Sequence, residues 1–159
     1  MIPLLEELHR ELETDRARIE SALARLEPTD IWRRPRPSMS SIGNLCLHLA
    51  GNESHYIGRL IGKTSYVRRR SEEFTTENGP GREGLIEKLR EARATTTRAF
   101  ESLREDDLGR TVESDHPQDP TVLRTIIHVI EHYGYHTGQI VLLTRLFQAS
   151  DERLLEWGH

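Results

Sequence analysis

Three histidines recur at every fourth position of one apolar stretch, at His128, His132 and His136. In a helix, a step of four residues turns by about 400°, so successive histidines lie roughly 40° apart around the axis and about 6 Å apart along it. All three side chains would then point to a similar side of the helix. An i, i+4 histidine pair is a common way for one helix to offer two imidazole nitrogens to one metal ion. The spacing therefore predicts part of a metal site.

A further ligand is expected from a facing helix, as in other metal sites built in the core of helical bundles. A second apolar stretch carries His48, Asn52 and His55 at i, i+4 and i+7, positions that share one helix face. His48 lies among apolar residues, whereas His55 lies nearer the polar end of the stretch. His48 is therefore the better candidate for the third ligand.

We predict that one divalent metal ion is bound by His48, His132 and His136. We expect His55 and His128 to support these ligands or to face a substrate. The alternative is a set of core histidines, but three buried imidazoles without a metal would each need a polar partner. Three neutral imidazoles leave a metal with an open position, which is typical of catalytic sites. Such a metal can lower the pKa of bound water, or bind and activate a thiolate.

Several neighbouring residues leave alternatives open. Glu131 and Glu53 are each adjacent to a residue of the predicted site face, and each is either an acceptor for a ligand or, more simply, solvent-exposed. Cys46 is about 200° from His48 on the helix and is expected in the core. The run Arg68–Arg70 is either a solvated loop or an anchor for an anionic substrate.

Gly138 lies inside the predicted last helix, two residues after His136. Glycine costs helix stability relative to alanine, so close packing against a neighbouring element is the expected reason for its presence.

The composition limits the class of protein. The chain has 159 residues and is expected to form a single domain over residues 1–159. With 22 Lys plus Arg against 26 Asp plus Glu, the net charge of −4 argues against nucleic acid as a partner. The single cysteine rules out an internal disulfide and fits a reducing compartment. We find no membrane span and no signal peptide, and therefore expect a cytoplasmic protein.

Apolar residues recur with helical period in four segments, at about 4–26, 42–62, 85–103 and 121–147. Two long polar connections, about 63–82 and 104–120, separate the last three segments. The only weak strand candidate is Thr111–Glu113. The pattern predicts an all-α four-helix bundle in which at least one long connection crosses the bundle.

The chain resembles the DinB/YfiT-like superfamily of bacterial metal-binding four-helix proteins. The resemblance rests on Ser41–Asn52 (SIGNLCLHLAGN), on Glu131–Ile140 (EHYGYHTGQI), and on an Arg-x-x-Glu-Phe motif at Arg70–Phe74. It looks closest to an uncharacterised branch with these motifs. Thr137 departs from many relatives, which have arginine before the Gly-Gln pair, so substrate contacts do not carry over.

The resemblance implies a divalent metal, often nickel or zinc, bound by one histidine of the second helix and an i, i+4 pair of the last. In this sequence these are His48, His132 and His136. Related families include transferases and isomerases that use the thiols bacillithiol or mycothiol, and members are often homodimers.

Three functions remain open at this point. The first is a metal-dependent enzyme, most simply a thiol-cofactor-dependent transferase with a small-molecule substrate. The second is a metal-dependent hydrolase that uses metal-bound water. The third is a non-catalytic metal-binding or stress-response module. An open, basic pocket would favour the thiol transferase, and a closed, dry pocket would favour the module.

Overall fold

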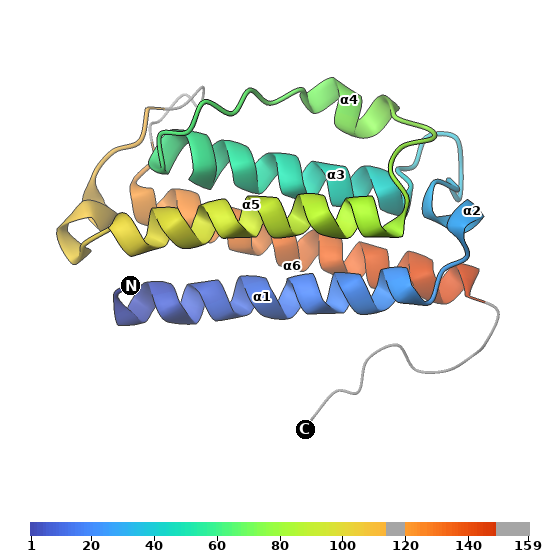
Figure 1. Cartoon of the computed structure of the whole chain (residues 1–159), viewed down its shortest axis with the longest axis horizontal. Coiled ribbons are helices and arrows are strands. Elements are labelled where there is room, and N and C mark those ends of the chain that lie inside the picture. Colours follow the sequence, from blue (N-terminus) through green and yellow to red (C-terminus); the bar gives the residue numbers. More distant parts are fainter. Residues whose placement is uncertain (114–119, 149–159) are drawn as a thin grey trace.

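The structure is a computed structural model that describes residues 1–113 and 120–148. Four long helices lie side by side (Figure 1): α1 (Pro3–Ala24), α3 (Ile42–Glu53) continued by the π-helix η1 (Ser54–Ile61), α5 (Arg82–Ser102) and α6 (Val122–Phe147). Shorter elements are α2 (Pro28–Ile31), α4 (Arg70–Thr75) and the 3₁₀-helix η2 (Glu105–Gly109). No strand occurs in the described ranges, and Thr111 and Thr121 form one isolated bridge. The predicted all-α four-helix bundle is confirmed.

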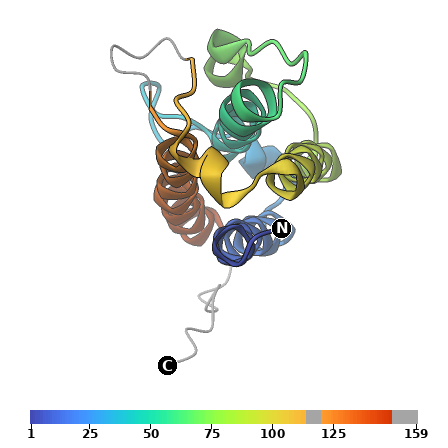
Figure 2. The ribbon, with the colours of Figure 1, turned by 90° about the vertical axis from the view of Figure 1, so that its left-hand side faces the viewer.

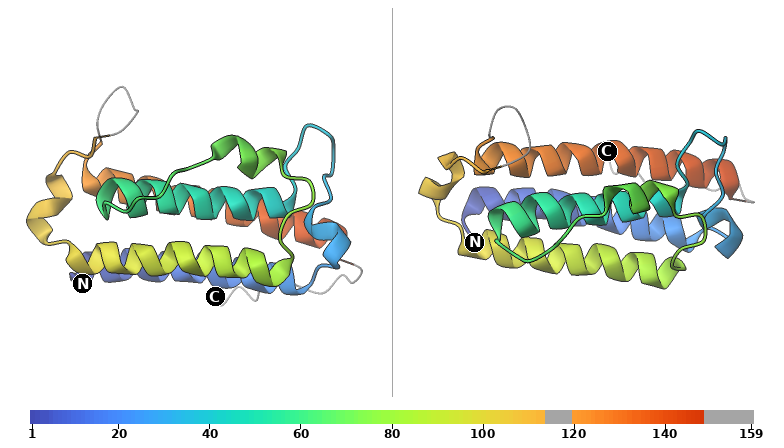
Figure 3. Two further views of the ribbon diagram at one scale, coloured as in Figure 1. Left: turned by 45° about the horizontal axis from the view of Figure 1, so that its top comes forward. Right: turned by 90° about the horizontal axis from the view of Figure 1, so that it is seen from above.

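The order of the helices around the bundle explains the long connections. Seen end-on, α1 and α3 lie diagonally opposite each other, and so do α5 and α6 (Figure 2). Helices α3 and α5 run in the same direction, opposite to α1 and α6 (Figure 1). The chain must therefore run back along the bundle between η1 and α5, and it carries α4 over the outside of α3 (Figure 3). The part of the other connection at 114–119 lies outside the described residues.

Local sequence signals set where the two site-bearing helices begin. Ser41 caps α3 in a capping box: its hydroxyl accepts from the Asn44 backbone N–H at 3.1 Å, and the Asn44 side chain accepts from the Ser41 backbone N–H. The Thr121 hydroxyl accepts from the Arg124 backbone N–H at 3.2 Å and caps α6. Side-chain caps satisfy backbone donors that have no partner within the helix. The starts of both helices are therefore encoded locally.

Each long helix contributes an apolar stripe to one shared core. Fully buried members include Leu5, Leu12, Ile19, Leu49, Ile57, Leu89, Phe100, Ile126, Val129 and Ile140. None of the helices in the described ranges is both long and apolar enough to cross a membrane. Burial of these stripes removes apolar surface from water and is the main term that favours the bundle.

One buried polar network joins all four long helices. The Glu53 carboxylate of α3 is fully buried and accepts from Arg93 Nε of α5 at 2.8 Å and from the Tyr133 hydroxyl of α6 at 2.6 Å. Arg93 also donates to Glu13 Oε1 of α1 at 2.9 Å. Burial opposes the charge on Arg93, but Glu53 outweighs it and raises the pKa of the guanidinium. The network fixes the register of the helices, because the buried charges of Glu53 and Arg93 are compensated only when these side chains meet.

The expectation that Glu53 is solvent-exposed or supports a ligand is wrong. It is committed to Arg93 and Tyr133, on a different side of α3 from His48. Sequence position alone could not reveal this, because both partners come from helices distant along the chain.

Candidate metal centre

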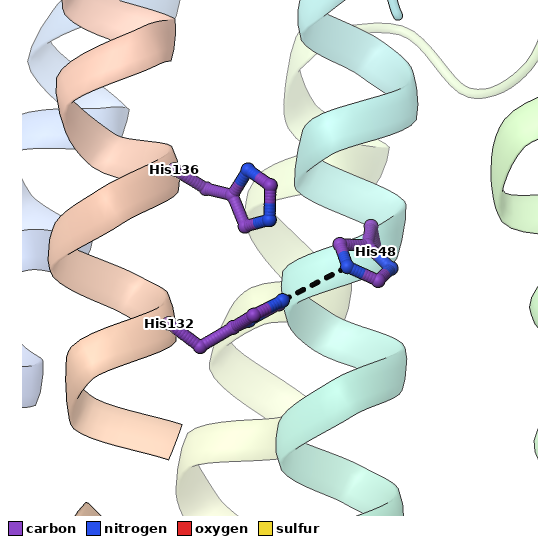
Figure 4. A group of neighbouring side chains, drawn as sticks. All are labelled: His48, His132 and His136. Carbon is purple, nitrogen blue, oxygen red and sulfur yellow. Dashed lines mark hydrogen bonds between the residues drawn. The ribbon is translucent and has the colours of Figure 1, made fainter. Parts of the chain in front are cut away.

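The three predicted ligands converge between α3 and α6. His48 projects from α3 toward His132 and His136 of the antiparallel helix α6 (Figure 4). One ring nitrogen of each lies within 4.8 Å of the others, and Nε2 of His48 and Nε2 of His132 are 2.9 Å apart. Two imidazole ligands of one divalent ion are separated by about 3 Å. The spacing of the nitrogens therefore fits one ion, with only small movements of the rings.

His48 is held from behind by an acidic residue of α4. Its Nδ1 lies 2.8 Å from Glu73 Oε2, and Glu73 also accepts from Arg68 Nε at 2.7 Å and from an Arg68 terminal nitrogen at 2.8 Å. Burial alone would raise the pKa of Glu73, but hydrogen bonds from His48 and Arg68 outweigh burial, and the pKa is lowered. The ionised carboxylate can only accept, so Nδ1 of His48 carries the proton. Its Nε2 then presents a lone pair to the site.

His136 is oriented by Gln139, one turn further along α6. Nδ1 of His136 lies 2.7 Å from the Gln139 side-chain oxygen and donates to it. Its Nε2 is then the unprotonated nitrogen available to a metal. Burial lowers the pKa of His136, so the ring is neutral near pH 7 and needs to lose no proton before it binds an ion.

His132 has a different environment from the other two. Burial, followed by repulsion from His136 and His48, lowers its pKa to about 3. Its Nδ1 is buried and accepts no hydrogen bond from the described part of the chain. Without a metal, Nε2 of His132 donates to Nε2 of His48. The Nδ1 atom then has a lone pair and no donor. A cation at the cluster would shift this proton from Nε2 to Nδ1, so that Nε2 of His132 and Nε2 of His48 would both present lone pairs to the ion.

The metal-free protein is expected to lose stability as the pH falls from 6.5 toward 3. The imidazole of His132 titrates near 6.5 when unfolded but at about 3 in the folded protein. The unfolded chain therefore binds more protons in this window, and acid favours unfolding. Urea midpoints measured with a chelator present at pH 7.5 and pH 5 would show a larger decrease for wild type than for His132→Ala. Equal decreases would contradict the lowered pKa.

The remaining histidines of this face stay outside the cluster. The His128 ring lies 5.9 Å from that of His132 and 5.0 Å from that of Tyr56, which in turn contacts His55 at 5.0 Å between ring centroids. They extend a row of aromatic rings away from the three converging imidazoles. A supporting or substrate-facing role for His55 and His128 stays a prediction.

The arginine run is divided among three environments. The Arg68 side chain is only 11% exposed and is held by Glu73, so for this residue neither the solvated loop nor the substrate anchor is correct. Arg69 is exposed and pairs with Glu72 at 3.3 Å. Arg70 is exposed, and its guanidinium carbon lies 5.4 Å from the centre of the Phe74 ring.

Two of the other predicted features are confirmed and one is wrong. Glu131 is exposed and lies 3.7 Å from Arg124, away from the cluster. Cys46 is buried in the core, and burial raises the pKa of its thiol to about 12. Gly138 does not pack closely: a Cβ built there would meet no atom within 4 Å.

Sequence reasoning missed the partners that orient the ligands. Glu73 and Gln139 both lie in the motifs that carry the superfamily resemblance, at Arg70–Phe74 and His136–Gln139. The motifs were a signal that these residues matter. Their hydrogen bonds to His48 and His136 depend on how α4 and α6 are placed in the fold. The motifs alone do not predict this placement.

Comparison with known proteins identifies the family. The sequence model of the family described as MST, mycothiol-S-transferase, matches residues 7–147. A crystal structure of a conserved protein from Enterococcus faecalis has the same fold, with a TM-score of 0.76 and 17% identity over 92% of this chain and 98% of that chain. No curated protein matches the sequence. The chain therefore belongs to the mycothiol-S-transferase family, a DinB/YfiT-like family of helical bundles.

Proposed function

We propose that this chain is a metal-dependent enzyme that transfers a low-molecular-weight thiol to an electrophilic small molecule. The observation that carries the proposal is the convergence of His48, His132 and His136 between α3 and α6. Membership of a family named for mycothiol transfer supports the thiol as co-substrate. In the reaction, the thiol sulfur forms a bond to the acceptor, and the thiol proton passes to the acceptor or its leaving group.

The chain supplies three uncharged imidazoles and holds them in position. A divalent ion bound there, with zinc or nickel the best fits to imidazole, would supply a Lewis acid that stabilises a thiolate near neutral pH. Glu73 and Gln139 set the tautomers of His48 and His136. The Phe74 ring lies 4.6 Å from that of His48, and the Tyr135 ring lies 4.9 Å from that of His136.

Access from solvent favours an enzyme over a closed metal-binding module. His132 and His136 are only half-buried, and Tyr135 beside them is 65% exposed. A substrate can therefore approach from the α6 side. Of the arginine run, Arg70 is the remaining candidate for an anionic substrate, because Arg68 pairs with Glu73 and Arg69 pairs with Glu72.

The test compares metal-loaded wild type with His136→Ala in transfer of mycothiol, bacillithiol, glutathione or coenzyme A to an electrophile such as a monohalobimane. We expect the wild type to transfer one of these thiols at a metal-dependent rate. The His136→Ala variant should show no such rate. Turnover of an ester or amide without thiol would favour a metal-dependent hydrolase. Stoichiometric metal binding without turnover of either kind would favour the non-catalytic module.

We further propose that the protein is a homodimer, in the reducing cytoplasm where a low-molecular-weight thiol is available. An apolar stripe on the outer face of α6 supports the dimer: Tyr135, Leu142 and Leu146 are 65%, 59% and 66% exposed, with Gly138 between them. Positions spaced by three, seven and eleven residues share one helix face. Such an exposed apolar stripe is typical of a surface that associates.

Replacing Leu142 by arginine is therefore expected to shift the protein from dimer to monomer, because a buried unpaired charge disfavours association. Analytical ultracentrifugation would measure the change in mass. Val67→Arg is the matched control, since Val67 is 70% exposed on the connection over α3 rather than on α6. A wild-type monomer, or equal behaviour of both variants, would contradict the proposed interface.

A further inference from the structure

Arg68 and Glu73 form a buried ion pair, here named the clasp, on the connection between η1 and α5. This connection passes over the outside of α3 and is not part of the four-helix core (Figure 3). The side chains of Arg68 and Glu73 are only 11% and 8% exposed, and two hydrogen bonds of 2.7 and 2.8 Å join them. A carboxylate buried to this degree must be compensated, so its partners are energetically significant.

The side chains of the clasp contact the core at His48. Glu73 Oε2 lies 2.8 Å from Nδ1 of His48, and an Arg68 nitrogen lies 3.2 Å from the same atom. The backbone of Glu73 is also held, because its carbonyl accepts from the Asn44 side chain at 3.0 Å. The carboxylate therefore reaches the proposed metal ligand through one defined atom.

Gly51 makes this approach possible. It lies three residues after His48, in the interior of α3, where glycine costs about 1 kcal/mol relative to alanine. A Cβ at this position would overlap Oε1 of Glu73 and lie 2.9 Å from its Cδ. Both atoms belong to a carboxylate held by Arg68 and His48, so alanine at position 51 would push the clasp away from His48.

We propose that docking of the clasp and metal binding are coupled through Nδ1 of His48, so that each stabilises the other. This inference rests on the proposed metal site. Glu73 fixes His48 in the tautomer that presents Nε2, and a metal on Nε2 makes Nδ1–H a stronger donor to Glu73. By thermodynamic reciprocity, metal binding must hold the clasp in place as much as the clasp favours metal binding.

The coupling would also affect a cavity of about 540 Å³ between the connection and α5. Glu73 forms part of its wall, together with Tyr66, Val67 and Arg69 of the connection, and Gly51 lies in its floor. When the clasp is released, this wall loses its side-chain attachment to His48 and keeps the backbone attachment to Asn44 of α3. Metal occupancy would then affect how firmly this wall of the cavity is held.

The first experiment measures affinity for zinc by competition with a chromophoric chelator. Glu73→Gln and Gly51→Ala are each expected to bind zinc about 10- to 100-fold more weakly than wild type. Glu72→Gln is the matched control for charge, because Glu72 is the exposed neighbour that pairs with Arg69. Gly138→Ala is the matched control for glycine in a site-bearing helix, since a Cβ there meets nothing within 4 Å. Both controls should bind zinc as wild type does.

The second experiment measures hydrogen exchange of the Glu72 and Thr76 amides, which donate within the connection to Arg69 O and Glu72 O at 3.0 and 3.2 Å. Zinc should slow their exchange in wild type and in both controls, but not in Glu73→Gln or Gly51→Ala. If the clasp only stabilised the connection, zinc would not change the exchange rates of these two amides.

The outcomes separate the two proposals. A wild type that binds no divalent ion would overturn the metal site, and the clasp coupling with it. A wild type that binds zinc while Glu73→Gln and Gly51→Ala bind it equally well, or exchange that zinc leaves unchanged, would overturn the coupling alone.

Discussion

Replacing His136 by alanine is expected to abolish stoichiometric binding of a divalent metal. Four-ligand zinc peptides bind zinc with about 10–16 kcal/mol, so one ligand accounts for roughly 3–4 kcal/mol, or on the order of 100- to 1,000-fold in affinity. The loss is compounded here, because the described part of the chain brings three protein ligands together rather than four. Elemental analysis after gel filtration and chelator competition would measure metal content and affinity.

His128→Ala is the matched control for this experiment. His128 lies one turn before His132 on the same helix, but its ring is 5.9 Å from that of His132 and it is not part of the converging group. Its replacement should weaken metal binding much less. Equal, small effects at positions 48, 128, 132 and 136 would mean that these residues are core histidines and not ligands.

Replacing Arg93 by methionine is expected to destabilise the fold by about 3–5 kcal/mol, because it leaves the Glu53 charge buried without its main partner. Glu53 is fully buried, and besides Arg93 the Tyr133 hydroxyl donates to its carboxylate at 2.6 Å. Urea denaturation of the metal-free protein would measure the free energy of unfolding without a contribution from bound metal.

Arg90→Met provides the control on the same helix. Arg90 donates to both carboxylate oxygens of Glu20, but its side chain is 55% exposed. Exposed ion pairs are screened by water, so the urea midpoint should stay close to that of wild type. In the double variant Glu53→Gln/Arg93→Met the buried charge is gone, and part of the lost stability should return. An Arg93→Met protein as stable as Arg90→Met would contradict the assigned role of the network.

The two predictions concern neighbouring parts of one interface. Tyr133 is adjacent to His132 on α6, and it anchors α6 to Glu53 of α3 on the side away from the metal cluster. The network holds α6 in register with α3, and this register is what brings His132 within 2.9 Å of His48. Arg93→Met should therefore also weaken metal binding, but less than His136→Ala.

The sequence by itself determined the fold class, the bounds of the long helices and the group of three converging histidines. These features depend on local rules. Apolar residues at helical spacing define one buried face, Ser41 and Thr121 cap the helices, and an i, i+4 pair lies on one side of α6 whatever surrounds it. The presence of a single histidine within the apolar part of the facing helix was enough to select His48.

Only the tertiary structure decided which charged residues serve the site and which serve the core. Glu53 and Glu73 look alike in the sequence, yet Glu53 joins the helices through Arg93 and Tyr133, whereas Glu73 reaches His48 through the gap left by Gly51. Tertiary packing also decides that Arg68 is held by Glu73 whereas Arg69 and Arg70 are exposed. Long side chains take partners from segments that are distant along the chain, and packing sets those distances. Local periodicity carries no information about them.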